Sequence, residues 1–371
     1  ARSVLHASVF QTAFHNQPGV DLRKFSTGTY IYPDASSNTL AGFSAYAQAQ
    51  TRYAAMYERV DDWAFAAASV TTPQALPEDV DLDGENEYLL YNDRVFAVFE
   101  RLGGRLTAAW VRDVLDGTVY QALGNQVGYS GTDSELEGTF NASSNGAVNA
   151  YRTSGLKDFY TTKGGGTNYV NNLFTVTYWT NGWRFVSSDG QIAKTVTLGP
   201  KHWAYRVQYQ MSGAMTGQVL FVRNGLSPNL GDLLLRGQQT LGALQNSGGI
   251  LSVANTNYGT TVNAFIQYSG DGHTAGYNAP ATDEHPSFNF YTIPMRNQAQ
   301  THQIELMGTN NFVFALGFQA RPSDWDGDGL PNVYEDGLPF LDSANPTDGG
   351  LDEDGDTVSN ADEWMMGTNP E

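Results

Sequence analysis

Three short apolar runs divided by two turn-forming dipeptides constrain the fold of this 371-residue chain more than any other feature. The runs cover residues 174–180, 183–188 and 192–198, and the dipeptides are Asn181-Gly182 and Asp189-Gly190. Asn-Gly and Asp-Gly favour the positive φ angles of type I′ turns, whose twist matches that of paired strands. The three runs are therefore predicted to form an antiparallel meander.

Short apolar runs of this kind continue through the middle of the chain. Val95, Ala97 and Phe99 alternate with neighbours on the other face, and a Gly103-Gly104 turn leads into a second strand. Further candidate strands cover residues 203–211, 217–223, 261–268, 287–294, 301–307 and 311–318. With 40 glycines available for turns, the pattern predicts a mainly β fold, with one large antiparallel β-sandwich over residues 73–320.

The N-terminal segment, residues 1–72, has a different periodicity. Apolar residues recur there at steps of three and four: Phe43, Tyr46, Tyr53, Met56, Tyr57, Val60, Trp63, Ala64 and Ala67. This spacing predicts a long amphipathic helix over residues 39–69. Its apolar stripe must be covered, either by the following domain or by a domain outside this chain.

Composition excludes several kinds of partner and site. A net charge of −19 would repel a phosphate backbone, so we expect no nucleic acid partner. No apolar run approaches the roughly 18 residues of a membrane span. The chain has no cysteine, which excludes disulfides and thiolate metal sites. Because the chain begins at Ala1, with neither Met nor a signal peptide, we expect a piece of a longer secreted or cell-surface precursor.

The acidic C-terminal segment, residues 321–371, holds two metal-loop patterns in series. A calcium loop of about twelve residues supplies oxygens from positions 1, 3, 5, 7, 9 and 12. The first loop offers Asp324, Asp326, Asp328, the Leu330 carbonyl, Asn332 and Glu335, and the second offers Asp352, Asp354, Asp356, the Val358 carbonyl, Asn360 and Glu363. The two loops predict a small calcium-binding domain; the alternative is a solvated acidic tail.

A third acidic stretch precedes the strand that begins near Tyr88. Its candidate ligands are Asp79, Asp81, Asp83, Glu85 and Glu87. Gly84 occupies the turn position, but Leu90 stands where the loop pattern requires a glutamate. We predict a smaller calcium loop at the junction of helix and sandwich, with a plain acidic turn as the alternative.

The C-terminal pattern resembles thrombospondin type 3 repeats and related calcium-binding repeats of bacterial secreted proteins. The resemblance covers about residues 323–371 and rests on the Asp-x-Asp-x-Asp ladders, the Asn and Glu after them, and the recurring Asn-Pro pairs. It implies calcium as a structural staple. It also implies Asp342 and Asp348 as added ligands between the loops.

The middle of the chain resembles the β-sandwich that follows the catalytic barrel in glycoside hydrolase family 57. The matching stretches are residues 83–90, 92–97, 103–106 and 224–229, with Leu233-Leu234 after them. The helix over residues 39–69 is similar to the segment that joins barrel to sandwich. The family's catalytic residues belong to the barrel, which this chain is too short to contain, so none is carried over.

For catalysis and for sugar binding, the sequence offers candidate residues but no specific motif. Asp158, Asp283 and Glu284 could serve as hydrolytic carboxylates, and Trp179, Trp183 and Trp203 could stack on sugars or fill the core. We expect a secreted, calcium-binding, non-catalytic module that scaffolds or displays a larger carbohydrate-active protein. The alternatives are a self-assembling filament subunit and a carbohydrate-binding module or glycoside hydrolase fragment. Its partners would be calcium, itself or a missing N-terminal catalytic domain, and a polysaccharide.

Overall fold

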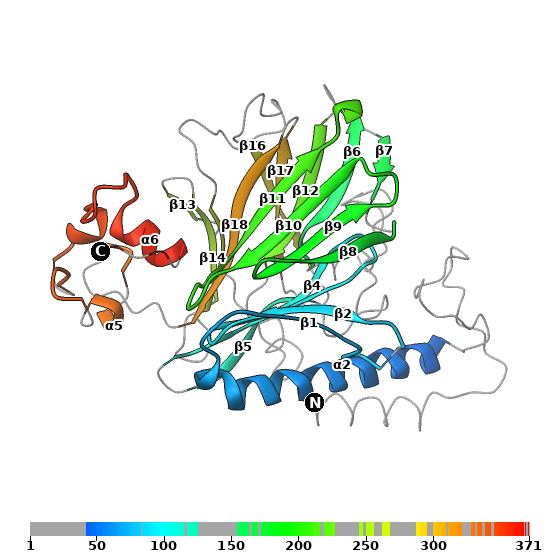
Figure 1. Cartoon of the computed structure of the whole chain (residues 1–371), viewed down its shortest axis with the longest axis horizontal. Helices are drawn as coiled ribbons and strands as arrows, with labels where there is room; N and C mark the ends of the chain where they lie inside the picture. The colour runs from blue at the N-terminus through cyan, green and yellow to red at the C-terminus, as the bar shows by residue number, and fades with distance from the viewer. Residues whose placement is uncertain are drawn as a thin grey trace.

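The computed structural model shows a mainly β protein with three antiparallel sheets, one long helix and a small C-terminal unit (Figure 1). It describes residues 42–82, 84–114, 117–124, 154–162, 165–169, 172–215, 219–226, 245–247, 250–255, 262–267, 287–294, 300–308, 311–320, 328–330, 332–335, 338–342, 345–366, 368 and 370. The predicted fold class is confirmed.

The first sheet has the strand order β1-β2-β3-β4-β5. Its strands are β1 (Gln74–Glu78), β2 (Glu87–Tyr91), β3 (Val95–Phe99), β4 (Leu106–Arg112) and β5 (Val119–Gly124). Every residue of β3 is buried, because Val95, Ala97 and Phe99 face the main core while Phe96 and Val98 face the long helix. The sheet is thus covered on both faces.

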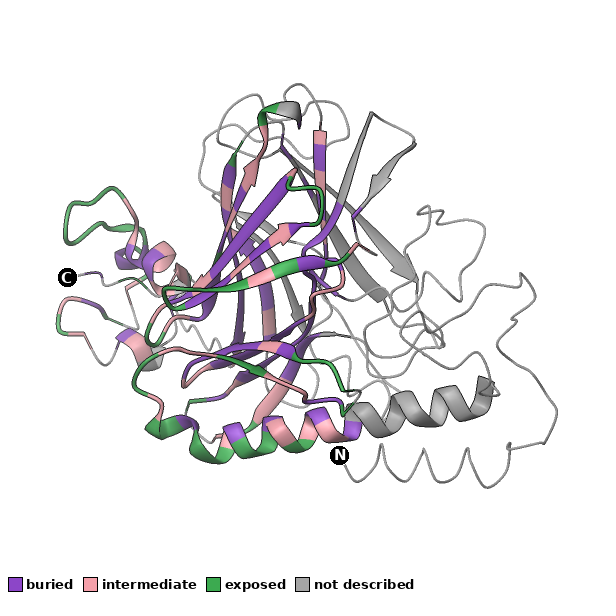
Figure 2. Ribbon diagram, turned by 45° about the vertical axis from the view of Figure 1, so that its right-hand side comes forward, coloured by how far each residue is buried: buried purple, intermediate pink, exposed green. Residues whose placement is uncertain are grey.

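The long helix α2 (Gly42–Ala66), continued by a 3₁₀ turn (Ala67–Ser69), lies along this sheet (Figures 1 and 2). Met56, Val60 and Trp63 of its apolar stripe are buried against β2, β3 and β4. The Trp63 indole N–H also donates to the Asn92 carbonyl at 2.7 Å. Among the side chains that the structure describes, the stripe therefore packs on its own chain and needs no external domain.

The second sheet has eight strands in the order β13-β14-β15-β18-β11-β10-β9-β8. Its strands are β8 (Phe174–Trp179), β9 (Gly182–Ser187), β10 (Ile192–Leu198), β11 (Ala204–Met211), β13 (Gln245–Ser247), β14 (Ile250–Asn255), β15 (Val262–Gln267) and β18 (Phe312–Ala320). The predicted meander is present as β8, β9 and β10.

The first meander turn differs in detail from the prediction. Trp179 pairs with Gly182, so the turn is centred on Thr180 and Asn181, and Asn181 takes the positive φ of 54°. Gly182 instead serves packing, because a Cβ there would lie 1.9 Å from the Val196 carbonyl oxygen.

The third sheet completes a sandwich with the second. Its order is β16-β17-β12-β6-β7, formed by β6 (Lys157–Thr162), β7 (Gly165–Asn168), β12 (Val219–Leu226), β16 (Ser287–Pro294) and β17 (Gln300–Gly308). One core cluster joins Leu220 of β12 to Val207 of β11 and Leu90 of β2. The region predicted as one large antiparallel β-sandwich therefore contains three sheets around a shared core.

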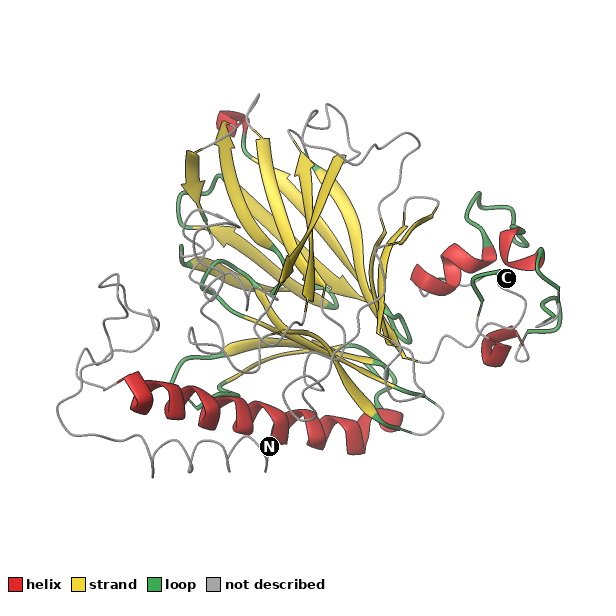
Figure 3. Ribbon diagram, turned by 180° about the vertical axis from the view of Figure 1, so that it is seen from behind, coloured by secondary structure: helices red, strands yellow, loops and turns green. Residues whose placement is uncertain are grey.

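The C-terminal unit lies beside the sheets (Figure 3) and has short helical elements. These are α5 (Asn332–Glu335), a 3₁₀ turn (Asp348–Gly350) and α6 (Asn360–Met366), and a 3₁₀ turn (Gly213–Met215) also follows β11. Met366 packs on Ala204, Phe265 and Ala315 of the eight-stranded sheet. Among the described helices, none combines the length and apolar character needed to cross a membrane.

Candidate metal centres

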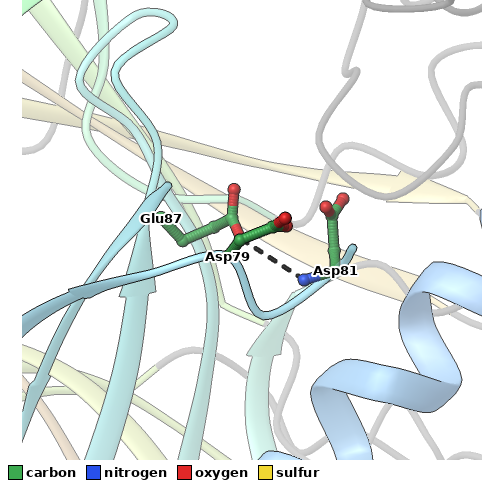
Figure 4. Close-up of side chains that lie close together, drawn as sticks. All are labelled: Asp79, Asp81 and Glu87. Carbon is green, nitrogen blue, oxygen red and sulfur yellow. Dashed lines mark hydrogen bonds between the residues drawn. The ribbon is translucent and has the colours of Figure 1, made fainter. Parts of the chain in front are cut away.

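The hairpin loop between β1 and β2 gathers the carboxylates of Asp79, Asp81 and Glu87, which we call the junction cluster (Figure 4). Pairing of Glu78 with Glu87 closes the loop, and one oxygen of each cluster carboxylate lies within 4.8 Å of the others. Glu87 Oε2 accepts the backbone N–H of Val80 at 2.8 Å. The loop thus has the acidic convergence predicted for the third stretch.

The remaining predicted ligands of this loop do not join the cluster. Glu85 is exposed and forms an ion pair with Arg101 at 3.7 Å. Asp83 lies outside the described residues. Gly84 has a φ of 94° and donates its N–H to Asp79 Oδ2 at 3.0 Å, which supports the turn role predicted for this glycine.

A second group, the first tail cluster, joins Asp328 and Glu335 of the first loop to Asp348. Asp328 Oδ1 accepts the N–H of Leu330 at 2.8 Å, and its Oδ2 accepts the N–H of Gly349 at 2.5 Å. Only glycine fits at position 349, since a Cβ would lie 2.5 Å from Asp328 Oδ2. The close approach places Asp348 beside the first loop, and its role as a ligand stays a prediction.

Burial distinguishes this cluster from an acidic surface. Asp348 is only 2% exposed; its Oδ2 accepts the N–H of Asp342, whereas its Oδ1 has no hydrogen-bond partner among the described residues. Glu335 is also buried. The sequence contains no Lys, Arg or His from Ser323 to Glu371, so this segment supplies no cation of its own. A buried carboxylate is costly unless a cation compensates its charge, so a bound metal ion would suit this site.

The second tail cluster consists of Asp352, Asp354 and Asp356 in the second loop. These side chains are exposed, and their oxygens accept successive backbone N–H groups, as in Thr357 N–H to Asp352 Oδ2 at 2.9 Å. Thr357, which stands where the pattern has glycine, takes a φ of 79°. The turn therefore forms without glycine, at the cost of a left-handed residue.

Glu363, the last predicted ligand of the second loop, lies in the first turn of α6 and is not a member of the second tail cluster. Its carboxyl is buried, with Oε2 lacking a hydrogen-bond partner among the described residues. Burial, together with the charges of Asp354, Asp356 and Asp352, raises the pKa of Glu363 to about 7. A bound cation would favour the ionised form that burial penalises.

The other predicted ligands of the two C-terminal loops lie outside the tail clusters or outside the described residues. The Asn360 side chain donates to the Asp348 carbonyl at 2.8 Å, and so ties the second loop to the first tail cluster. Asn332 begins α5, Leu330 is buried, and Val358 donates its N–H to Asp356. Asp324 and Asp326 lie outside the described residues.

A cluster of aromatic rings in edge-on and tilted contact joins the C-terminal unit to the sheets next to Glu363. The Trp364 ring centroid lies 5.7 Å from that of Trp203 and 4.4 Å from that of Tyr334. The Arg94 guanidinium lies over both indoles, 4.8 Å from Trp203 and 5.8 Å from Trp364. Sequence reasoning missed this contact, because it links three segments far apart in the chain.

The three tryptophans considered for sugar stacking differ in how far they are buried. Trp183 and Trp203 are core residues, and the Trp183 indole donates to the Leu89 carbonyl at 2.8 Å. Trp179 is 47% exposed at the end of edge strand β8. Among these tryptophans, only Trp179 can meet a ligand at the surface.

The hydrolytic candidate Asp158 is a structural residue. Its carboxylate is fully buried, 2.7 Å from Lys194 Nζ, and accepts the Tyr209 hydroxyl at 2.7 Å. Burial raises the pKa of Asp158 and lowers that of Lys194. A substrate cannot reach this pair. Asp283 and Glu284 lie outside the described residues.

Comparison with known proteins gives only weak structural neighbours. No protein-family model matches the chain, and no curated protein matches it. A 4-alpha-glucanotransferase from Thermococcus litoralis aligns at 11% identity and a TM-score of 0.34, over 73% of this chain and 42% of the enzyme. The periplasmic domain of Thermotoga maritima YidC aligns at 11% identity and a TM-score of 0.30, over 60% of this chain and 82% of that domain.

A YidC insertase structure gives similar values, 12% identity and a TM-score of 0.30, over 69% of this chain and 45% of the insertase. This chain thus spans less than half of the glucanotransferase. The resemblance to glycoside hydrolase family 57 stays a prediction. Likeness of this size assigns neither a family nor an activity, and the resemblance to thrombospondin type 3 repeats stays a prediction.

Proposed function

We propose that this chain is a secreted, calcium-binding, non-catalytic module in which calcium fastens the C-terminal unit and the β1–β2 loop. The observation that carries the proposal is the first tail cluster, where Asp348 and Glu335 are buried beside Asp328. Their oxygens are hard ligands, and the C-terminal unit has neither Cys nor His to favour a softer metal. Calcium is the divalent cation that such carboxylate-rich loops suit best.

A structural role follows from where the ligands lie. Glu363 belongs to the second loop and directly precedes Trp364, which packs on Trp203 of the sandwich. An ion that holds Glu363 also holds the helix that docks the unit. Exposed ligands such as Asp352 and Asp354 suit the weak affinities of extracellular calcium modules, about 10⁻⁴ to 10⁻³ M. The scaffold or display role in a larger carbohydrate-active protein belongs to the same proposal.

Limited proteolysis of the full chain with calcium and with a chelator tests the proposal. Calcium at about 100 times its dissociation constant would stabilise the folded unit by about 2.7 kcal/mol, because it binds only the folded form. We expect chelation to expose cleavage sites within residues 323–371 while the sheets resist. Equal fragment patterns with and without chelator would refute a structural role for calcium.

Direct calcium titration provides the second measurement. We expect saturable binding by the full chain, with magnesium at the same concentration binding more weakly, because it requires a tighter octahedral shell. Reducing-end assays on starch, glycogen and pullulan test the non-catalytic part, and turnover above a heat-treated control would contradict it.

A further inference from the structure

The eight-stranded sheet has an outer face that is unusual for so acidic a chain. On β8 to β11, alternate residues such as Phe185, Val196 and Val207 enter the core, so their neighbours point away from it. One cross-strand row on the outward side joins Thr177, Arg184, Thr195 and Gln208. We call the outward residues of these four strands the outer face.

The outer face is polar but carries no carboxylate. Apart from Trp179, its strand residues are hydroxyl, amide, guanidinium and small apolar groups, although the whole chain has 39 acidic residues and a net charge of −19. Two arginines, Arg184 and Arg206, lie on strands separated by β10. Two strand spacings and an offset of two residues along the strands place the Cα atoms of the two arginines about 12 Å apart.

Neither arginine is neutralised by a carboxylate within the part of the chain that the structure describes. Arg184 donates to the Thr195 hydroxyl at 3.2 Å, and Arg206 donates to the Gln208 side-chain oxygen at 3.2 Å. These hydrogen bonds orient each guanidinium but use few of its five N–H donors. The remaining donors can bind carboxylate or sulfate oxygens in a bidentate manner.

Trp179 adds an aromatic surface to the same face. Trp179 is 47% exposed and ends the edge strand β8, and the Arg184 guanidinium carbon is 5.5 Å from its ring centroid. This contact holds the Trp179 indole beside Arg184. An exposed indole next to hydroxyl and amide groups can cover the apolar side of a sugar ring while its neighbours bind hydroxyls.

We infer that the outer face of β8 to β11 binds an acidic polysaccharide. Arg184 and Arg206 take its anionic groups, and Trp179 stacks on a sugar ring. Charge complementarity selects this occupant, because the strand residues of this face carry two arginines and no carboxylate, although the acidic C-terminal unit packs on its edge at Ala204 through Met366. Nucleic acid is disfavoured, since its charge density demands many more cationic contacts than two.

Binding of the full chain to hyaluronan, pullulan and poly-glutamate, with calcium and with chelator, tests the inference. Affinity electrophoresis compares wild type with Trp179→Ala, Arg206→Gln and the double variant Arg184→Gln/Arg206→Gln. Arg101→Gln is the matched control, because Arg101 is also exposed but lies away from the outer face, paired with Glu85. Unchanged thermal unfolding midpoints show that each variant folds.

We expect hyaluronan to bind with and without calcium, and poly-glutamate and pullulan to bind much more weakly. Arg206→Gln and Trp179→Ala should each weaken binding about tenfold, the size of one charge-assisted contact, while Arg101→Gln leaves it unchanged. No hyaluronan binding by wild type, or equal binding by the double variant, would overturn the inference. Equal binding of poly-glutamate would show a site for acidic protein, and binding lost only with chelator would show bridging by calcium.

Discussion

Asp348 is the residue on which the calcium proposal depends most, because its position cannot be explained by solvation. A carboxylate this deeply buried, with one oxygen lacking a hydrogen-bond partner among the described residues, raises the free energy of the folded state unless a cation is bound. Removing its charge should therefore have opposite effects with and without calcium. That sign change separates a ligand from an ordinary structural aspartate.

Asp348→Asn is predicted to weaken calcium binding by about tenfold or more, equivalent to about 1.4 kcal/mol. Without calcium, the same change should make residues 323–371 more resistant to protease, because one buried like charge is gone. Calcium titration and proteolysis in chelator measure the two effects. Glu353→Gln removes an exposed charge from the same unit and should change neither by a comparable amount. Lower resistance of Asp348→Asn in chelator would contradict the ligand role.

The raised pKa of Glu363 predicts how calcium binding depends on pH. Its pKa in the folded protein, about 7, lies above its ordinary value of 4.5, so the calcium-free folded state binds the proton more tightly than the unfolded state does. The resulting stability is present below pH 4.5 and is lost as the pH rises through 7. Calcium competes with that proton, so its affinity should fall between pH 8 and pH 6. Titrations at both values measure this, and a Glu363→Gln variant that keeps the full dependence would assign it elsewhere.

At the level of secondary-structure elements, α6 connects the metal loop to the sheets. Glu363 faces the acidic loop, Trp364 packs on Trp203, and Met366 packs on Ala204, the first residue of β11. A short helix of seven residues is unstable alone, so docking and ion binding must support each other. The Arg94 guanidinium over both indoles strengthens the contact by cation–π attraction.

Trp364→Ala is predicted to release the C-terminal unit from the sheets even when calcium is present. Loss of the aromatic contact should cost about 3 kcal/mol of docking free energy, in the range for large aromatic truncations. Hydrogen exchange of α6 in saturating calcium measures the release. Phe65→Ala is the control, since Phe65 is 96% exposed on α2 and should have no effect on α6. Unchanged protection of α6 in the Trp364 variant would show that the loops alone hold the unit.

At the scale of the whole molecule, the long helix and the buried Lys194–Asp158 ion pair both contribute to holding the sheets together. The described part of the helix stripe is covered by the first sheet, so it offers no exposed apolar patch for filament assembly. Self-assembly stays a prediction. Within the core, Lys194 Nζ donates to the Gly103 and Leu156 carbonyls as well as to Asp158, and so connects loops and strands from two sheets.

Lys194→Met is predicted to lower the free energy of unfolding by about 3 to 5 kcal/mol, because it leaves Asp158 buried without its cation. Urea denaturation measures the loss. Tyr209→Phe removes only one hydrogen bond to Asp158 and should cost about 1 to 3 kcal/mol. A smaller loss for Lys194→Met than for Tyr209→Phe would show that the pair is not the main polar contact of the core.

The sequence alone determined the features that local chemistry dictates. The three-strand meander follows from turn residues and short apolar runs, the helix from its three- and four-residue periodicity, and the acidic groupings from Asp spacing along single loops. The tertiary structure decided what depends on distant segments. Asp348 joins Asp328 through the close approach of Gly349, Trp203 is covered by Trp364, and Asp158 meets Lys194 in the core. Such contacts leave no periodic signal, because each is set by how whole elements pack rather than by the residues beside it.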